Sequence, residues 1–418
     1  MAAWHLGRRG HDVTVWEAAD SVGGWAQTLP WPGPGGEPGW LERGPQSLRV
    51  ARGSALGRLL LELDISCLPS GPRGPRWLGK EGSRHPSPAT VAGLLRAPGP
   101  SPVERLRMLA EPFVGWGQHP GDSLHSFFAR RLGEGFARDW LPALVAGVLA
   151  APPEHLGLEA LPRLRRLEAA GGLFLGALRL GPERTVRPAG GSGALAAALA
   201  ARLPVATHRA VRALEPLPGG RWRANADGTT AEADHLVLAL PSSQAAPLLS
   251  ALAPSPAAAL AAIPRLDLRV WHSRHAMVGG WERGFGLLIH PPEGRGLLGA
   301  VSLAADDPRG VPGLLQIRTY VGGAYPVAPT LSEWGGVIRE LRRWLPELGE
   351  AVQMQEEVCP GAFPLLEPGH SARVAQITLA LPPSLHWLGT ERFGPGVPDL
   401  AEGIENWGNQ LFATDKPG

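Results

Sequence analysis

The sequence predicts an α/β fold, and the prediction rests on neighbouring features close to the first residue. Residues 12–17 place Val13 and Val15 on one face in a run too short for a helix, which predicts a short buried strand. The strand ends in an acid, Glu17, and a glycine pair, Gly23 and Gly24, follows it. In a βαβ unit that binds a dinucleotide, an acid at this place accepts hydrogen bonds from ribose hydroxyls. Glycines let the backbone approach the ligand, since no Cβ stands in the way.

Residues 2–10 indicate the end of a helix that leads into this strand. Arg8 and Arg9 suit the negative end of the helix dipole, and Gly10 suits the position just past the helix. A dinucleotide fold also needs a first strand and a Gly-x-Gly-x-x-Gly loop roughly 20 residues before the acid. We therefore expect the loop to lie upstream of Met1 and the chain to enter the motif in mid-helix.

The segment 2–28 resembles the FAD-dependent amine-oxidase-like superfamily just after its glycine loop. Within that superfamily, Gly23-Gly24-Trp25 and Glu42-Arg43-Gly44-Pro45 are similar to the early pattern of the protoporphyrinogen/coproporphyrinogen oxidases of haem synthesis. The resemblance implies an FAD-binding Rossmann-like domain, incomplete at its N-terminus, beside an α+β substrate domain and a helical subdomain. It also implies cofactor contacts from Glu17, Gly23, Gly24, Trp25, Gly44 and Pro45.

Composition limits the other classes of function. The 418 residues, 44% of them apolar, suffice for one large or two to three ordinary domains. A net charge of +2 gives no case for binding nucleic acid. Cys67 and Cys359 form no Cys-x-x-Cys pair and the histidines lack metal-ligand spacing, so we expect no metal site and a reducing, cytoplasmic location. No run of about 18 apolar residues predicts a transmembrane helix.

We expect three structural parts. Residues 1–70, 186–253 and 371–418 form the discontinuous FAD-binding domain, 71–90 and 254–370 the substrate-binding domain, and 91–185 the helical subdomain. Periodicity predicts a helix over 49–63 and another over 121–133, the latter capped by Asp122 or Ser123 and stopped by Gly133. The order of elements from 121 to 164 is similar to the family's helical region.

Later segments carry further expected cofactor contacts. Residues 190–195 predict a loop entering a helix, which we interpret as a turn packed beside the flavin. Val211, in a short strand, matches the position where the family meets adenine through a backbone amide. Asp227-Gly228 predicts a hairpin between 221 and 234, and a buried strand follows over 235–241.

The C-terminal region resembles the family's second flavin-binding segment. Gly389, Gly394, Val397 and Asp399 fall at the family's spacing, and Asp399 would open a helix whose amides face the pyrophosphate or the flavin ring. This sequence departs from the pattern at two places: Arg392 replaces an aromatic residue, and Ile404 stands where glycine is usual.

Arg76 is the candidate substrate residue. It lies in a predicted hairpin and matches a family arginine implied to meet a substrate propionate, a task that suits a guanidinium because it binds carboxylate bidentately. The alternative is a solvated surface arginine. Segments 284–291 and 296–301 resemble two strands of the family's substrate sheet, and Gly369-His370 resembles its Gly-His, although the family's preceding Gln-Tyr is absent.

Two interpretations remain open for residues 95–116, which are apolar with scattered arginines. An amphipathic basic segment can dock on the inner face of a membrane, as this region can in the family. The other interpretation is a helix with one face in the core.

The resemblance implies an FAD-dependent oxidase that converts a porphyrinogen, a tetrapyrrole, to porphyrin with O2 as acceptor. The flavin would carry the chemistry, so no catalytic side chain is assigned. The alternatives are another flavoenzyme of the superfamily, such as an amine oxidase or carotenoid desaturase, and a non-catalytic remnant that no longer binds FAD.

Overall fold

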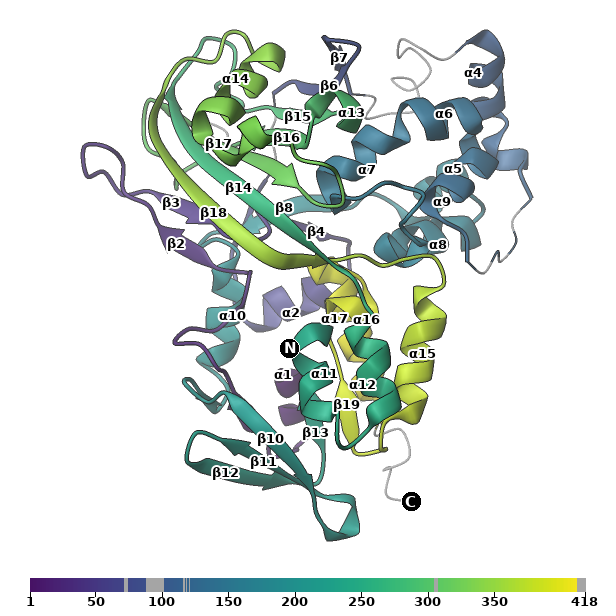
Figure 1. Cartoon of the computed structure of the whole chain (residues 1–418), viewed down its shortest axis with the longest axis vertical. Coiled ribbons are helices and arrows are strands. Elements are labelled where there is room, and N and C mark those ends of the chain that lie inside the picture. Colours follow the sequence, from purple (N-terminus) through teal and green to yellow (C-terminus); the bar gives the residue numbers. More distant parts are fainter. Residues whose placement is uncertain are drawn as a thin grey trace.

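The computed structural model describes residues 1–70, 74–87, 101–115, 117, 119, 121–303 and 307–411. A large mixed sheet occupies the upper half of the molecule in Figure 1, with helices α4–α9 beside it, and smaller sheets with their own helices occupy the lower half. The two halves are joined by long strands that run diagonally between them.

Two short parallel sheets form the centre of the lower half. Strand β1 (Val15–Trp16) pairs with β9 (Val205–Ala206), and β13 (Leu236–Leu238) pairs with β19 (Leu385–Trp387). The predicted strand over 12–17 is wrong in length and burial, because β1 has two residues, both half-buried. Its only paired neighbour among the described strands is the equally short β9. The predicted strand over 235–241 likewise shortens to β13.

Helices surround these parallel pairs. They are α1 (Ala2–Gly7), α10 (Gly193–Ala200), α11 (Ser242–Leu249), α12 (Pro254–Ala261), α15 (His370–Ala380), α16 (Thr390–Phe393) and α17 (Val397–Leu411). One core cluster packs α11, α12 and α15 against β13 and β19, with Trp387 fully buried. Helix α12 therefore packs with the lower half, and the chain returns to the large upper sheet at Arg265, where β14 begins.

Three smaller sheets lie in the lower half and at its boundary with the upper half. Strands β10 (Val211–Pro216), β11 (Trp222–Ala226) and β12 (Thr229–Ala233) form a meander, and the two-residue turn between β11 and β12 confirms the Asp227-Gly228 hairpin. The other two sheets consist of β2 (Thr28–Pro30) with β3 (Trp40–Glu42), and of β4 (Leu48–Val50), β8 (Arg184–Pro188) and β5 (Cys67–Pro69).

The predicted helix over 49–63 begins later than expected. Residues 48–50 form β4, and helix α2 (Ala55–Glu62) starts after Ser54, whose side chain caps the N–H of Gly57 at 3.2 Å. Gly53, at φ +71°, turns the chain between strand and helix. The predicted apolar face is confirmed, since Leu56, Leu59, Leu60 and Leu63 are buried.

Seven strands form the upper sheet in the order β18-β14-β17-β16-β15-β6-β7. The predicted hairpin around Arg76 is β6 with β7, and the two predicted substrate-sheet strands are the antiparallel pair β15 and β16. A core of aromatic and aliphatic side chains lies between the sheet and α14. The bounds are β6 (Arg76–Lys80), β7 (Ser83–Pro86), β14 (Arg265–Ala276), β15 (Gly286–Ile289), β16 (Leu297–Ser302), β17 (Leu314–Gly322), β18 (Ala351–Pro364), α13 (Pro291–Gly294) and α14 (Trp334–Trp344).

Helices α4–α9 pack beside this sheet around one apolar core. Ser123 caps α5 and Gly133 ends it at φ +98°, which confirms the predicted helix over 121–133. A Cβ at Gly147 of α7 would lie 2.2 Å from the Leu288 side chain, so helix and sheet meet closely there. The bounds are α4 (Pro102–Leu109), α5 (Leu124–Leu132), α6 (Glu134–Asp139), α7 (Leu141–Leu149), α8 (Pro162–Ala169) and α9 (Leu173–Leu180).

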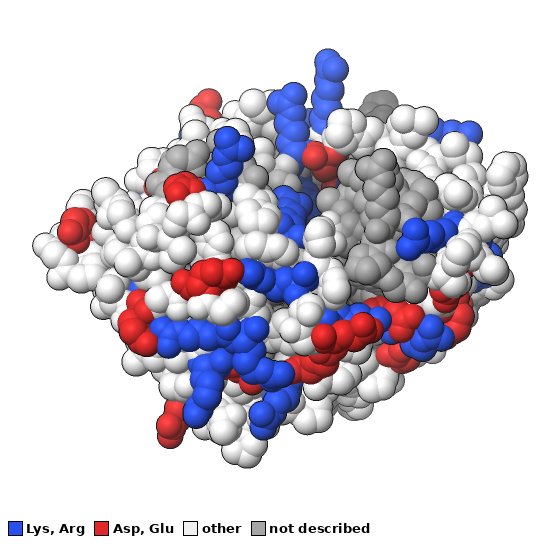
Figure 2. Space-filling model, turned by 90° about the horizontal axis from the view of Figure 1, so that it is seen from above, with Lys and Arg blue, Asp and Glu red and all other residues white. Residues whose placement is uncertain are grey.

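Charges on the face seen in Figure 2 are mixed in sign. Lys and Arg side chains lie next to Asp and Glu side chains, with broad uncharged areas between them.

Candidate functional site

Helices α1 and α17 run side by side in the same direction. Met1 shares an apolar cluster with Val397 at the start of α17, while Leu6 shares another with Trp407 farther along. Arg9, just past α1, hydrogen-bonds Asn409 near the end of α17. Because the positive end of a helix dipole is its N-terminus, the two helices direct their positive ends to the same side.

Glu17 lies at the carboxyl end of β1, beside the start of β10. Its N–H donates to the carbonyl of Ala206 (2.9 Å), and its carbonyl accepts the N–H of Arg209 (2.8 Å), two residues before Val211. Its carboxylate oxygen Oε1 accepts the N–H of Ala19 at 2.9 Å. The structure thus brings Glu17 and Val211 to one edge of the lower half.

Gly44 packs directly on the backbone of Trp25. A Cβ at Gly44 would lie 2.3 Å from the Trp25 carbonyl oxygen, so this contact requires glycine. The Arg43 guanidinium lies over the Trp25 ring at 4.9 Å. Gly23 and Gly24 adopt φ of +107° and +56°, and nothing lies within 4 Å of a Cβ placed at Gly24. These two predicted segments, with half-buried Pro45 next in the chain, therefore form one unit.

Glu42, immediately before Arg43 in the chain, holds this unit in place through its buried carboxylate. Its buried carboxylate accepts hydrogen bonds from Thr28 Oγ1 (2.7 Å) and from the N–H and Oγ of Ser192 (3.2 and 2.6 Å), and it pairs with Arg309. The turn at 190–193 is therefore packed against β2 and β3, as predicted for its local structure. The Arg309 contact was not predicted, because no local pattern links residues so far apart in sequence.

A buried polar cluster on the upper sheet contacts the same loop. Arg318 of β17 donates to the carbonyl oxygens of Arg43 and Gly44, while Glu357 of β18 pairs with the Arg43 guanidinium. His272 Nε2 of β14 lies 3.7 Å from Glu357. Burial lowers the pKa of His272. Burial alone would raise the pKa of Glu357, but the contacts of this carboxylate with His272 and Arg43 outweigh burial, so the pKa of Glu357 is lowered. The sequence does not predict this cluster, because only the register of β14, β17 and β18 brings its residues together.

The predicted C-terminal residues lie between β19 and the first turn of α17. Gly389 precedes α16, Val397 begins α17, and Asp399 is in its first turn. Burial raises the pKa of Asp399 to about 6, although Arg166 Nη2 lies 3.2 Å from its Oδ1. A Cβ at Gly396 would lie 2.6 Å from Asp399 Oδ2, so the turn before α17 closes tightly on this carboxyl group.

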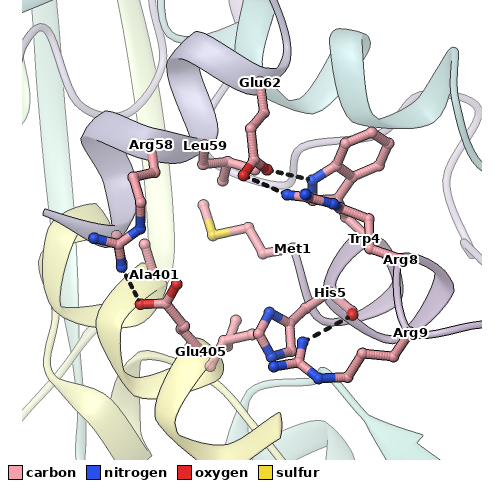
Figure 3. A pocket seen from close by; sticks show the side chains of 12 residues that line it. Met1, Trp4, His5, Arg8, Arg9, Arg58, Leu59, Glu62, Ala401 and Glu405 are labelled. Carbon is pink, nitrogen blue, oxygen red and sulfur yellow. Dashed lines mark hydrogen bonds and ion pairs between the residues drawn. The ribbon is translucent and has the colours of Figure 1, made fainter. Parts of the chain in front are cut away.

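A cavity of about 400 Å³ opens between α1, α2 and α17 (Figure 3). Leu59, Ala401 and Ile404 supply apolar lining, and ion pairs Arg8–Glu62 and Arg58–Glu405 link the helices. The predicted cofactor residues do not line this cavity, and neither does Arg76.

Arg76 lies at the start of β6, exposed, and opposite Gly286 of β15 in parallel register. The next residue, Trp77, packs with Trp281 and Phe285. The structure thus places Arg76 in the upper sheet, on the strand next to the predicted segment 284–291.

Within the described part of the chain, no group of three or more His, Cys, Asp or Glu side chains could hold a metal ion. A search of the same residues for a helix both long and apolar enough to cross a bilayer finds none. Part of the predicted amphipathic segment, residues 95–100 and 116, lies outside the described residues.

The family model described as flavin containing amine oxidoreductase matches residues 1–373. The chain belongs to this family. Proteins of similar sequence include the protoporphyrinogen oxidase of Homo sapiens. It is 31% identical over 369 residues, which cover 78% of this chain and 75% of the human protein. The Bos taurus protoporphyrinogen oxidase is 31% identical over 389 residues, covering 82% and 78% respectively.

Solved structures confirm the fold of the amine oxidoreductase family for this chain. Cyclohexylamine oxidase from Brevibacterium oxydans superimposes with a TM-score of 0.67 at 18% identity, covering 100% of this chain and 96% of that one. The chain is therefore an FAD-dependent oxidoreductase of mixed α/β architecture, as sequence analysis predicted.

The described residues fit FAD in two respects. The positive N-terminal end of α17 suits a pyrophosphate. The open space beside Gly24, at a turn already in the left-handed region, suits close approach of a ligand to the backbone.

Proposed function

We propose that this chain oxidises a porphyrinogen, proto- or coproporphyrinogen, to the porphyrin with O2 as acceptor, in haem synthesis. The observation that carries the proposal is the 31% identity to human protoporphyrinogen oxidase over 78% of this chain. When bound, FAD supplies hydride acceptance from the substrate and electron transfer to O2. The protein's own residues bind and orient both molecules.

We assign cofactor contacts to the residues that the structure groups around α1, α17 and the end of β1. Glu17 would accept hydrogen bonds from the ribose hydroxyls, and the backbone of Val211 would meet the adenine. The N-terminus of α17 would face the pyrophosphate or the flavin ring. The remaining contacts would come from Gly23, Gly24, Trp25, Gly44, Pro45, Gly389, Val397 and Asp399.

We assign substrate binding to the upper sheet, so that the chain consists of the three parts expected from sequence. A porphyrinogen is flat and apolar with carboxylates at its rim, so its site needs apolar walls and a few cations. Arg76 supplies such a cation at the exposed start of β6. Its role would be to hold a propionate rather than to react.

Peripheral contact with the inner face of a membrane is part of this proposal. An apolar patch on α4, the 3-10 turn after it and α9 exposes Val103 (76%), Leu106 (68%), Phe113 (90%) and Leu178 (79%). Such a surface favours insertion into the interfacial region of a bilayer. Flotation with anionic vesicles tests it: the wild type should float and Phe113→Ser/Leu178→Ser should not. Equal flotation would contradict membrane contact through this patch.

The function is tested with the chain saturated with FAD. Oxygen uptake and porphyrin fluorescence are measured with protoporphyrinogen IX and coproporphyrinogen III, and oxygen uptake alone with putrescine and cyclohexylamine. Turnover of a porphyrinogen above its spontaneous oxidation supports the proposal. Turnover of an amine alone identifies an amine oxidase instead. A chain that binds no FAD in a titration supports the non-catalytic alternative.

A further inference from the structure

A second cavity, of about 280 Å³, lies at the opposite end of α17 from the proposed pyrophosphate contacts. It is bounded by α15 and the turn after it, by β19 and α16, and by the last turns of α17, which adjoin one another in Figure 1. Most of its lining is apolar or aromatic: Leu381, Pro382, Pro383, Leu385, Trp387, Trp407 and Leu411. The polar lining residues are Thr378, His386, Arg392 and Gln410.

Arg392 is the only charged side chain of this lining, in which no acid occurs. Its Nη1 donates to the carbonyl of Trp387 at 2.8 Å, and its guanidinium lies over the Phe393 ring at 5.1 Å. No carboxylate of the described residues pairs with it. Burial lowers the pKa of Arg392, as expected for a cation removed from water without a counterion.

The walls around Arg392 are held in place. The His386 ring packs edge-on against Trp407 at 5.3 Å, and its Nε2 lies 3.2 Å from Nδ1 of His235. Burial, with His235 and Arg392 nearby, lowers the pKa of His386 to about 4, so this ring is neutral at pH 7. Trp387 is fully buried and donates through Nε1 to the carbonyl of Leu240 at 3.1 Å. The cavity therefore combines aromatic walls with one cation that has no carboxylate partner among the described residues.

We propose that this cavity binds a small carboxylate with a flat apolar body, at a site separate from the flavin reaction. The carboxylate would pair with the guanidinium of Arg392, which has donors free for a bidentate contact. The apolar body would lie between Trp407 and the proline turn formed by Pro382 and Pro383. The volume suits a ligand of about one or two rings, below the usual range for drug-sized ligands.

Isothermal titration calorimetry with 2-naphthoate tests this site. The neutral analogue 2-naphthamide has the same rings, and Arg392→Met removes the cation while keeping an unbranched apolar stem. We expect 2-naphthoate to bind the wild type at least ~10-fold more tightly than 2-naphthamide does, and Arg392→Met to abolish that preference. Arg138→Met, which removes an exposed arginine paired with Asp139, is the matched control and should leave binding unchanged.

Several results would overturn the proposal: no binding of 2-naphthoate, equal affinity for acid and amide, or unchanged affinity in Arg392→Met. Arg392→Lys keeps the charge without the planar fork and should retain part of the preference, which covers the case in which Arg392→Met fails to fold. The titration is run with and without FAD. Because it does not use porphyrinogen turnover, failure of the proposed function leaves this test intact.

Discussion

Arg309 and Glu42 form an ion pair that is almost completely shielded from water, between the segment that leads to β17 and the end of β3. The same carboxylate accepts hydrogen bonds from Ser192 and Thr28. Breaking a buried pair from one side leaves an uncompensated charge, which costs more than the pair itself contributes.

We therefore expect Arg309→Met to lower the free energy of unfolding by about 3–5 kcal/mol. The double variant Glu42→Gln/Arg309→Met should recover part of this loss, since it leaves no unpaired carboxylate. Urea denaturation of the two variants and the wild type measures both effects. An equal or larger loss in the double variant would show that packing, not charge, accounts for the cost.

Gly44 provides a steric test of the loop at residues 43–44, which Arg318 and Glu357 of the upper sheet contact. Gly44→Ala would place a Cβ 2.3 Å from the Trp25 carbonyl, so backbone must move, and we expect a loss of about 1–3 kcal/mol. Gly7→Ala, in α1, is the control. Nothing lies within 4 Å of a Cβ placed at Gly7, and alanine stabilises a helix by about 1 kcal/mol relative to glycine. Thermal unfolding should show a lower Tm for Gly44→Ala and an equal or higher Tm for Gly7→Ala.

Asp399 predicts a pH dependence. Its pKa of about 6 in the fold exceeds the ordinary value of 3.8, so the folded state binds the proton more tightly than the unfolded state. Its ionisation therefore costs stability as pH rises from about 4 to above 6. Since its side chain keeps 18% exposure, we discount the full shift and expect Asp399→Asn to be about 1–2 kcal/mol more stable than wild type at pH 8, but equal at pH 4. Urea denaturation across this range would refute the assignment if both curves stayed parallel.

Glu17 tests the cofactor assignment. We expect Glu17→Ala to weaken FAD by about 1.5–3 kcal/mol, the range for hydrogen bonds to a charged group. Asp20→Ala, an exposed acid in the same loop, is the control and should not change affinity. Flavin fluorescence titration measures both. Unchanged FAD affinity in Glu17→Ala would show that this carboxylate accepts the N–H of Ala19 but does not bind the cofactor.

Sequence and structure agree best where a local rule acts. The cap at Ser123, the stop at Gly133 and the Asp227-Gly228 hairpin depend on residues a few positions apart, and each was predictable. The family resemblance located the segments around Glu17 and Gly44. The contacts of Arg318 and Glu357 with that loop were not predictable, because they depend on the register of β14, β17 and β18. The early start assigned to α2 was wrong because periodicity alone overlooked the turn at Gly53.

Arg76 provides the sharpest test of the substrate assignment, because a residue that only holds a propionate affects binding of ground state and transition state alike. We expect Arg76→Ala to raise KM for a porphyrinogen about 10-fold or more while kcat changes little. Arg76→Lys should recover part of the loss, since an ammonium lacks the bidentate fork. Arg212→Ala is the control, because this exposed arginine pairs with Asp227 at 3.2 Å in the β10–β12 meander, away from the upper sheet. Oxygen uptake by the FAD-saturated chain provides both KM and kcat. An unchanged KM in Arg76→Ala would show that Arg76 is a surface residue that does not bind the substrate.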